Sequence, residues 1–165
     1  MLGGGPPGVL MPDRQHLLLY DGVCGLCNWL VQLVLARDRD GQFHFAALQS
    51  TQARDALAAF GHRPDTLDTV YVVEAYRSAS PRLLSHGRAA LFVFARLGGA
   101  WRAMSALRLL PAPVLDWGYR LVARHRYRLF GRLDQCLLPH AAVRQRFIDA
   151  AGGAPVTSAL PASKP

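Results

Sequence analysis

A short apolar strand that runs into two cysteines at the start of a helix is the feature that most constrains this chain. Residues 17–20 form an apolar run typical of a buried strand, and Asp21-Gly22 is a turn dipeptide. Cys24 follows, and residues 26–36 are apolar except for two polar positions over the length of a helix. The segment predicts a strand, a turn and a helix, with Cys24 at or just before the first helical turn.

The second cysteine, Cys27, stands three positions after Cys24, so the two thiols lie on adjacent turns and can reach bonding distance. Free backbone N–H groups and the dipole at a helix start favour the thiolate, which is the reactive form of cysteine. We interpret Cys24 as the attacking thiolate, near the exposed helix end, and Cys27 as a more deeply buried thiol that resolves the mixed disulfide. The alternatives are that both are buried small hydrophobic residues or that they bind zinc.

Asp21 is the third candidate site residue. A partly buried carboxylate has a raised pKa and can accept the proton of Cys27 through a water molecule. The same spacing also allows Asp21 to bond the N–H groups of its own turn. Both interpretations of Asp21 stay open on the sequence.

The role of Cys136, the remaining cysteine, is open: a second resolving thiol, a zinc ligand, or an inert core residue. A zinc set would join it to Cys24, Cys27 and His140. Pro139 interrupts that spacing, and no second Cys-X-X-Cys matches the first. We therefore expect no metal and no organic cofactor, and we keep a non-catalytic zinc-stabilised interaction domain as an alternative.

The composition indicates a globular protein of a reducing compartment. The chain has 165 residues, of which 51% are hydrophobic, enough for one domain with an appended subdomain. Three cysteines are too few and odd in number for a secreted disulfide framework. The first dozen residues do not resemble a signal peptide, and no apolar run approaches the ~20 residues of a membrane span. We expect a cytoplasmic protein.

The hydrophobic pattern predicts the order strand, helix, strand, helix, strand, strand, helix, which is that of a thioredoxin-like domain. The predicted segments are residues 17–20, 26–36, 43–46, 50–60, 69–74, 82–84 and 85–97. The first two strands are expected to be parallel, because a crossover helix joins them. Further helices are expected at residues 100–109, 114–124 and 141–150, with a break at Pro111 and Pro113.

These patterns divide the chain into four parts. They are a flexible leader (1–14), a redox core (15–99), a helical extension packed on the core (100–150) and a disordered tail (151–165). The expected fold class is α/β, a mixed sheet with flanking helices and a helical C-terminal extension.

Positive charge is concentrated in the second half, with a net charge of −3 over residues 1–75 and +11 over residues 76–165. Residues 124–132 interleave four arginines with two aromatic residues. We interpret this stretch as an anchored helix whose arginines stay solvated, and we expect no nucleic-acid partner because no such motif accompanies it. The alternative is a basic module that binds nucleic acid or makes a weak peripheral contact with a membrane. Trp29, Trp101 and Trp117 are expected to be packing residues.

The sequence resembles the DCC family of thiol-disulfide oxidoreductases, which is named for one Asp and two Cys. The matching segments are Tyr20-Asp21-Gly22-Val23-Cys24-Gly25-Leu26-Cys27-Asn28, Arg37-Asp38, Phe45-Ala46-Ala47-Leu48-Gln49-Ser50 and Ala123-Arg124-His125-Arg126-Tyr127-Arg128-Leu129-Phe130-Gly131 with Cys136. The resemblance extends over residues 16–148. It implies a thioredoxin-like fold and dithiol–disulfide exchange, with Asp21, Cys24 and Cys27 as the namesake residues. Because residues 124–132 match a signature of the family, the resemblance also leaves open that this stretch packs over the redox helix and shapes access to it.

The sequence therefore predicts a protein-disulfide oxidoreductase that cycles Cys24 and Cys27 between dithiol and disulfide. The expected partner is a protein or a small molecule that carries a thiol or a disulfide. Redox poise depends on the relative stability of two states, so the sequence gives no direction of electron transfer.

Overall fold

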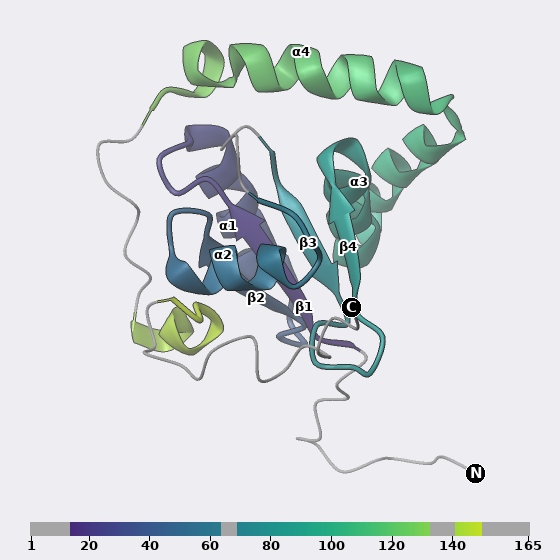
Figure 1. The fold of residues 1–165 in the computed structure, drawn as a ribbon. Coiled ribbons are helices and arrows are strands. Elements are labelled where there is room, and N and C mark those ends of the chain that lie inside the picture. Colours follow the sequence, from purple (N-terminus) through teal and green to yellow (C-terminus); the bar gives the residue numbers. More distant parts are fainter. Residues whose placement is uncertain (1–13, 64–68, 133–140, 150–165) are drawn as a thin grey trace, which may run out of the picture.

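The computed structural model describes residues 14–63, 69–132 and 141–149, and its centre is a four-stranded mixed sheet of order β2-β1-β3-β4 (Figure 1). β1 (His16–Tyr20) pairs in parallel with β2 (Phe43–Ala47) and antiparallel with β3 (Tyr71–Glu74). β3 pairs antiparallel with the edge strand β4 (Arg82–Ser85). The predicted α/β, thioredoxin-like architecture is confirmed.

Helices cover both faces of this sheet. Even-numbered residues of β1, such as Leu18, pack in one core cluster with α1 (Gly25–Arg37) and α3 (His86–Leu97). Odd-numbered residues, such as Leu17, pack in a second cluster with α2 (Thr51–Ala58). The alternation of side chains along a strand thus divides the core into two layers.

Local signals explain where the helices begin and end. The Ser50 hydroxyl accepts a hydrogen bond from the Ala53 N–H, as expected of an N-cap, and α2 starts at the next residue. The expected end of this helix near residue 60 is two residues too late, since α2 ends at Ala58. α3 ends before Gly98, whose φ of 68° suits glycine.

The C-terminal part is helical, as predicted, but its elements differ from the prediction. η2 (Gly99–Leu109) is a 3-10 helix, and so is the short η3 (Ala141–Arg146). α4 (Ala112–Phe130) begins two residues before, and ends six residues after, the expected helix at 114–124. The prolines that were expected to break the chain lie at the start of α4, where a proline costs no hydrogen bond.

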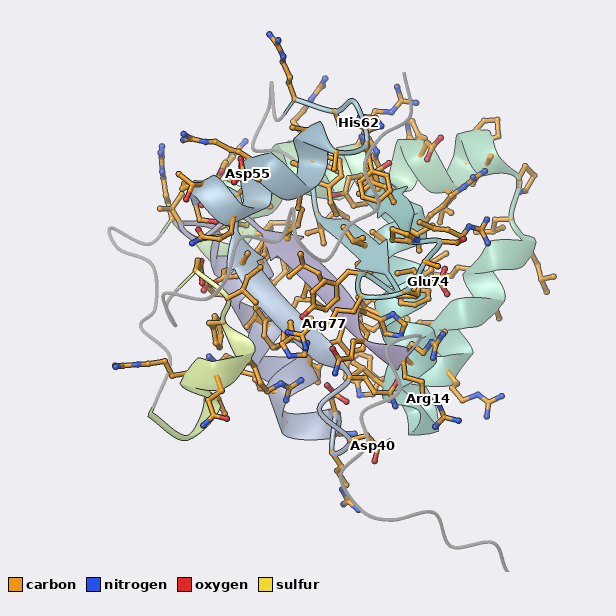
Figure 2. All side chains as sticks on the ribbon, turned by 60° about the horizontal axis from the view of Figure 1, so that its bottom comes forward. Arg14, Asp40, Asp55, His62, Glu74 and Arg77 are labelled. Atoms are coloured by element: carbon orange, nitrogen blue, oxygen red, sulfur yellow. The ribbon has the colours of Figure 1, made fainter. Side chains whose placement is uncertain are left out.

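α4 lies across the end of the sheet where β1 leads into α1 (Figure 1). Within the described part of the chain, no helix combines the length and apolar character that a membrane span needs. Charged side chains such as Asp40, Asp55 and Arg77 lie on the outside of the sheet and its helices (Figure 2). The expected leader and tail lie outside the described residues, apart from Arg14.

Candidate active site

The two cysteines lie at the N-terminal end of α1, as predicted. Cys24 is the N-cap residue, with extended backbone angles, and Cys27 is in the first turn of α1. The Asn28 side-chain amide donates to the carbonyl oxygens of Gly22 (2.9 Å) and Cys24 (3.0 Å), which fixes the turn before the helix. Both cysteines are free thiols, and a hydrogen bond joins their side chains.

This hydrogen bond separates the acidities of the two thiols. The bond from Cys27 lowers the pKa of Cys24 from 9.0 to about 6, and burial opposes this shift only in part. Backbone N–H groups of the first helical turn and the Arg126 guanidinium also lower the pKa of Cys24. The same thiol–thiol bond, together with burial, raises the pKa of Cys27 far above its ordinary value. One acidic and one weakly acidic thiol therefore lie side by side.

Neither thiol is exposed, and the expectation that Cys24 lies near an exposed helix end is wrong. Cys24 has 0% of its surface exposed and Cys27 has 3%. Residues 131 and 132, which follow α4, contact the start of α1: the Gly25 N–H donates to the Gly131 carbonyl (3.3 Å), and Cys24 forms an isolated β-bridge with Arg132. A side chain at Gly25 would overlap the carbonyl oxygen of Phe130, so only glycine permits this close approach.

Asp21 is 1% exposed, and each of its carboxylate oxygens accepts two hydrogen bonds from described residues. Oδ1 accepts from the Val23 N–H (3.2 Å) and from the Gln49 side-chain amide (2.8 Å). The Val23 bond is the turn interaction that the sequence allowed for Asp21. Oδ2 accepts from Arg126 (3.3 Å) and from the Tyr127 hydroxyl (2.6 Å). Asp21 therefore ties the turn before the cysteines to α4.

Arg126 is the functional candidate that the sequence analysis missed, because all arginines of residues 124–132 were expected to be solvated. It is 2% exposed and forms an ion pair with Asp21 at 3.3 Å. Its guanidinium also lies 4.6 Å from the ring centroid of Tyr127 and donates to the Tyr127 hydroxyl (2.8 Å). The helical spacing of Tyr119, Ala123 and Arg126 was the available signal, since these three residues share the less exposed face of α4.

Comparison with known proteins matches the site and most of the chain to one family. A model of the DCC1-like thiol-disulfide oxidoreductase family matches residues 18–132, which include Asp21, both motif cysteines and Arg126. The chain belongs to this DCC1-like family. No solved structure matches the chain significantly.

Two relatives are similar to this chain over most of their length. YuxK of Bacillus subtilis is 36% identical over 138 residues, which are 84% of this chain and 96% of YuxK. A chloroplastic DCC family protein of Arabidopsis thaliana is 36% identical over 128 residues, which are 76% of this chain and 71% of that protein. The resemblance seen in the sequence is confirmed.

The proposed zinc set cannot be assembled from the described part of this DCC1-like chain. Cys136 and His140 lie outside the described residues. Among the residues that are described, no group of three or more His, Cys, Asp or Glu side chains could hold a metal ion.

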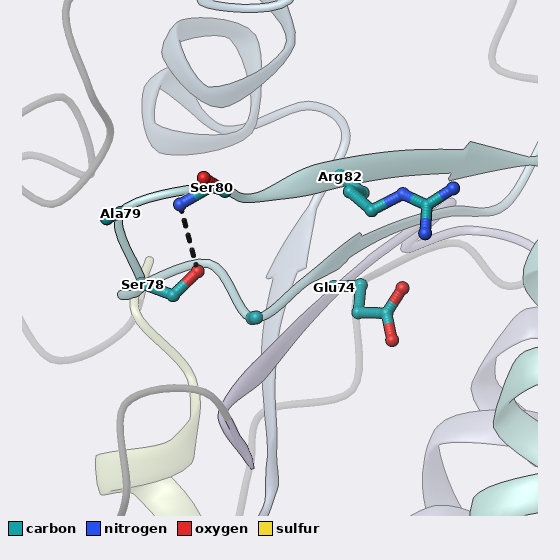
Figure 3. Close-up of a pocket in the computed structure, with 6 residues that line it drawn as sticks. Glu74, Ser78, Ala79, Ser80 and Arg82 are labelled. Carbon is teal, nitrogen blue, oxygen red and sulfur yellow. Dashed lines mark hydrogen bonds between the residues drawn. The ribbon is translucent and has the colours of Figure 1, made fainter.

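A hollow of about 340 Å³ lies at the turn between β3 and β4, away from the thiols (Figure 3). Its walls include Glu74, Ser78 and Ser80, and the Ser80 N–H donates to the Ser78 hydroxyl (3.3 Å). The register of β1 and β3 places Glu74 at the end of the sheet opposite Cys24. The hollow contains no nucleophilic thiol, so the candidate active site of this DCC1-like protein is the cysteine pair.

Proposed function

We propose that this protein catalyses thiol–disulfide exchange through Cys24 and Cys27. The observation that carries the proposal is the opposite shift of the two thiol pKa values, with Cys24 lowered to about 6 and Cys27 raised. At neutral pH Cys24 is a thiolate that accepts a hydrogen bond from the Cys27 thiol. This division of roles suits a nucleophile next to a resolving thiol.

The reaction starts when the Cys24 thiolate attacks one sulfur of a substrate disulfide. A mixed disulfide forms, and the substrate's other sulfur leaves as a thiolate and takes up a proton. Cys27 then loses its proton and attacks Cys24 Sγ, which gives the Cys24–Cys27 disulfide and the second substrate thiol. The substrate gains two electrons and two protons, and the protein loses two electrons. A second dithiol returns the protein to its reduced form by the reverse steps.

Asp21 and Arg126 are positioning residues in this proposal. Arg126 provides the buried positive charge that favours the thiolate of Cys24, and Asp21 holds Arg126 in place. Asp21 accepts four hydrogen bonds in this arrangement, which supports a structural task for its carboxylate. The role of proton acceptor for Cys27 stays a prediction.

Access to the thiol is the second requirement of the mechanism. Cys24 has no exposed surface, and residues 130–132 contact the backbone of Cys24 and Gly25. A protein disulfide reaches Cys24 Sγ only when this segment moves aside. We infer that opening of the end of α4 precedes exchange with a protein partner.

The test is a thiol titration before and after oxidation with a twofold excess of hydroxyethyl disulfide, followed by peptide mass mapping. We expect a Cys24–Cys27 disulfide that dithiothreitol reverses, and a trapped mixed disulfide on Cys24 in Cys27→Ser. Cys24→Ser is the matched control and should trap nothing. Failure of the wild-type protein to form this disulfide contradicts the proposal, and one equivalent of zinc bound through the cysteines would support the zinc-stabilised alternative.

A further inference from the structure

A cavity of about 520 Å³ lies between α1, α3, η2 and α4, and Cys27 is part of its wall. Almost every other lining residue is apolar, and the walls of the cavity come from four separate elements. Cys24 is not among the lining residues. The redox pair therefore faces two environments, with Cys24 under the end of α4 and Cys27 at the cavity.

The mouth of the cavity carries large apolar side chains that water reaches. Trp117 is 65% exposed, Val114 49% and Trp29 46%, and all three line the cavity. The expectation of a packing residue is therefore wrong for Trp117. It is confirmed for Trp101, whose ring stacks on Phe94, and Trp29 packs edge-on against Trp101 despite its exposure. Exposed apolar side chains that converge on one cavity indicate a binding site.

The polar atoms near the inner end are already engaged within the protein. The Tyr119 hydroxyl accepts from the Val70 N–H (3.1 Å), and Arg126 is paired with Asp21. A peptide in this cavity would bury backbone N–H and C=O groups without partners, which is costly. The occupant that fits is an apolar molecule with few polar atoms.

The Cys27 thiol in the cavity wall narrows the class of ligand further. We propose that this cavity binds a lipid-soluble quinone as an electron acceptor for the Cys24–Cys27 dithiol. A quinone combines an apolar ring and tail with a centre that accepts two electrons, so it matches both the apolar wall and the adjacent thiol. This inference rests on the proposed redox function and names an oxidant that takes the place of the substrate disulfide and returns the pair to its disulfide form after a dithiol has reduced it.

The reaction balances without another reactant. The bond that forms is the Cys24–Cys27 disulfide, and the bonds that break are the S–H bonds of the pair, one of whose protons is released as the Cys24 thiolate forms. Two electrons pass from the pair to the quinone, with one proton from Cys27 and one from water, and the two carbonyl oxygens become the hydroxyl groups of the quinol.

Gly118 offers a way to fill the cavity without disturbing the thiols. It lines the cavity from α4, and a Cβ atom at this position meets no atom within 4 Å. Gly118→Leu should therefore place an apolar side chain in the binding space. Arg124→Leu is the matched control, since it introduces the same side chain at an exposed position of α4 outside the cavity.

The first measurement is the binding of decylubiquinone, which is monitored through the quenching of tryptophan fluorescence. We expect saturable binding to the wild type and to Arg124→Leu, and binding at least tenfold weaker for Gly118→Leu, with circular dichroism confirming that both variants fold. Equal binding by Gly118→Leu and the wild type overturns the assignment of the cavity. The assignment is also overturned if the protein is a dimer and binding depends only on dilution of that dimer into single chains, because a second copy of the chain would then cover the mouth.

The second measurement follows quinol formation and thiol loss under anaerobic conditions. The fully substituted ring of decylubiquinone does not form stable thiol adducts, so we expect one quinol for each Cys24–Cys27 disulfide. Binding without oxidation overturns the role of electron acceptor. Hydroxyethyl disulfide is run in parallel: if it oxidises the pair and the quinone does not, the inference fails while the proposed function stands. If neither oxidises the pair, both fail.

Discussion

Replacing Arg126 by methionine removes the positive partner of a carboxylate that has almost no contact with water. The side chains of Arg126 and Asp21 are 3% and 1% exposed, and their charged atoms are 3.3 Å apart. Methionine keeps much of the length and apolar stem of arginine. The variant Arg126→Met therefore isolates the loss of charge and of hydrogen-bond donors.

The expected loss of stability follows from this geometry. At 3.3 Å and an effective dielectric constant of about 20, the attraction between the two charges is about 5 kcal/mol. Measured costs of removing one partner of a buried ion pair are about 3–5 kcal/mol, because the other charge stays buried alone. This is a large share of the ~5–15 kcal/mol that stabilises a typical domain. For a chain of this size the midpoint of thermal unfolding should fall by about 6–20 °C.

The assay is urea and thermal unfolding of Arg126→Met beside Arg124→Met, which makes the same change at an exposed position of α4. Arg124→Met should change the free energy of unfolding by no more than about 0.5 kcal/mol. Adding Asp21→Asn to Arg126→Met should restore part of the loss, because residue 21 then carries no buried charge. The pKa of Cys24 should also rise in Arg126→Met, since the guanidinium lowers it in the wild type. Equal unfolding midpoints for Arg126→Met and Arg124→Met would refute the reasoning.

Three further predictions concern pH and the covering segment. The absorbance of the Cys24 thiolate at 240 nm should appear with a midpoint near pH 6, since the pKa is lowered to about 6, and the rate of disulfide exchange should rise over the same range; a midpoint near 9 in the wild type contradicts this. Gly25→Ala should separate the end of α4 from α1 and speed the alkylation of Cys24 by iodoacetamide, while an unchanged rate would show that the cover already opens freely. Burial lowers the pKa of His16 to about 4, so the unfolded state binds more protons than the folded state between pH 6.5 and 4. The free energy of unfolding should therefore fall as the pH is lowered through this range. Between pH 7 and pH 5 the loss measured by urea unfolding should be about 2 kcal/mol smaller in His16→Asn than in the wild type, where His44, whose pKa burial also lowers to about 4, adds to the loss.

The sheet and the position of the cysteines could be predicted because their signals are local. A short apolar run gives β1, alternating apolar residues give β2, and the start of α1 after a turn dipeptide places Cys24 at the N-cap. A helix between two nearby strands makes them parallel, as found. None of these inferences needs a contact between distant parts of the chain.

The missed features depend on contacts across about a hundred residues. Residues 131 and 132 contact Gly25 and Cys24 across more than 100 positions, and Arg126 pairs with Asp21, 105 positions earlier. Hydrophobic patterning assigns an arginine to the solvent unless its partner is known. The length of α4 was missed for a local reason, because proline at a helix start and proline in a break give the same sequence signal.

The pairing of Asp21 with Arg126 has a consequence for how the chain matures. Synthesis delivers the strand, the turn and both cysteines about a hundred residues before the guanidinium that neutralises the carboxylate. A nascent or truncated chain that stops short of residue 126 must either leave Asp21 in water, with the sheet unable to close around it, or bury a lone negative charge. Assembly of the reactive pair is thereby tied to completion of the polypeptide, so fragments released early lack a poised nucleophile.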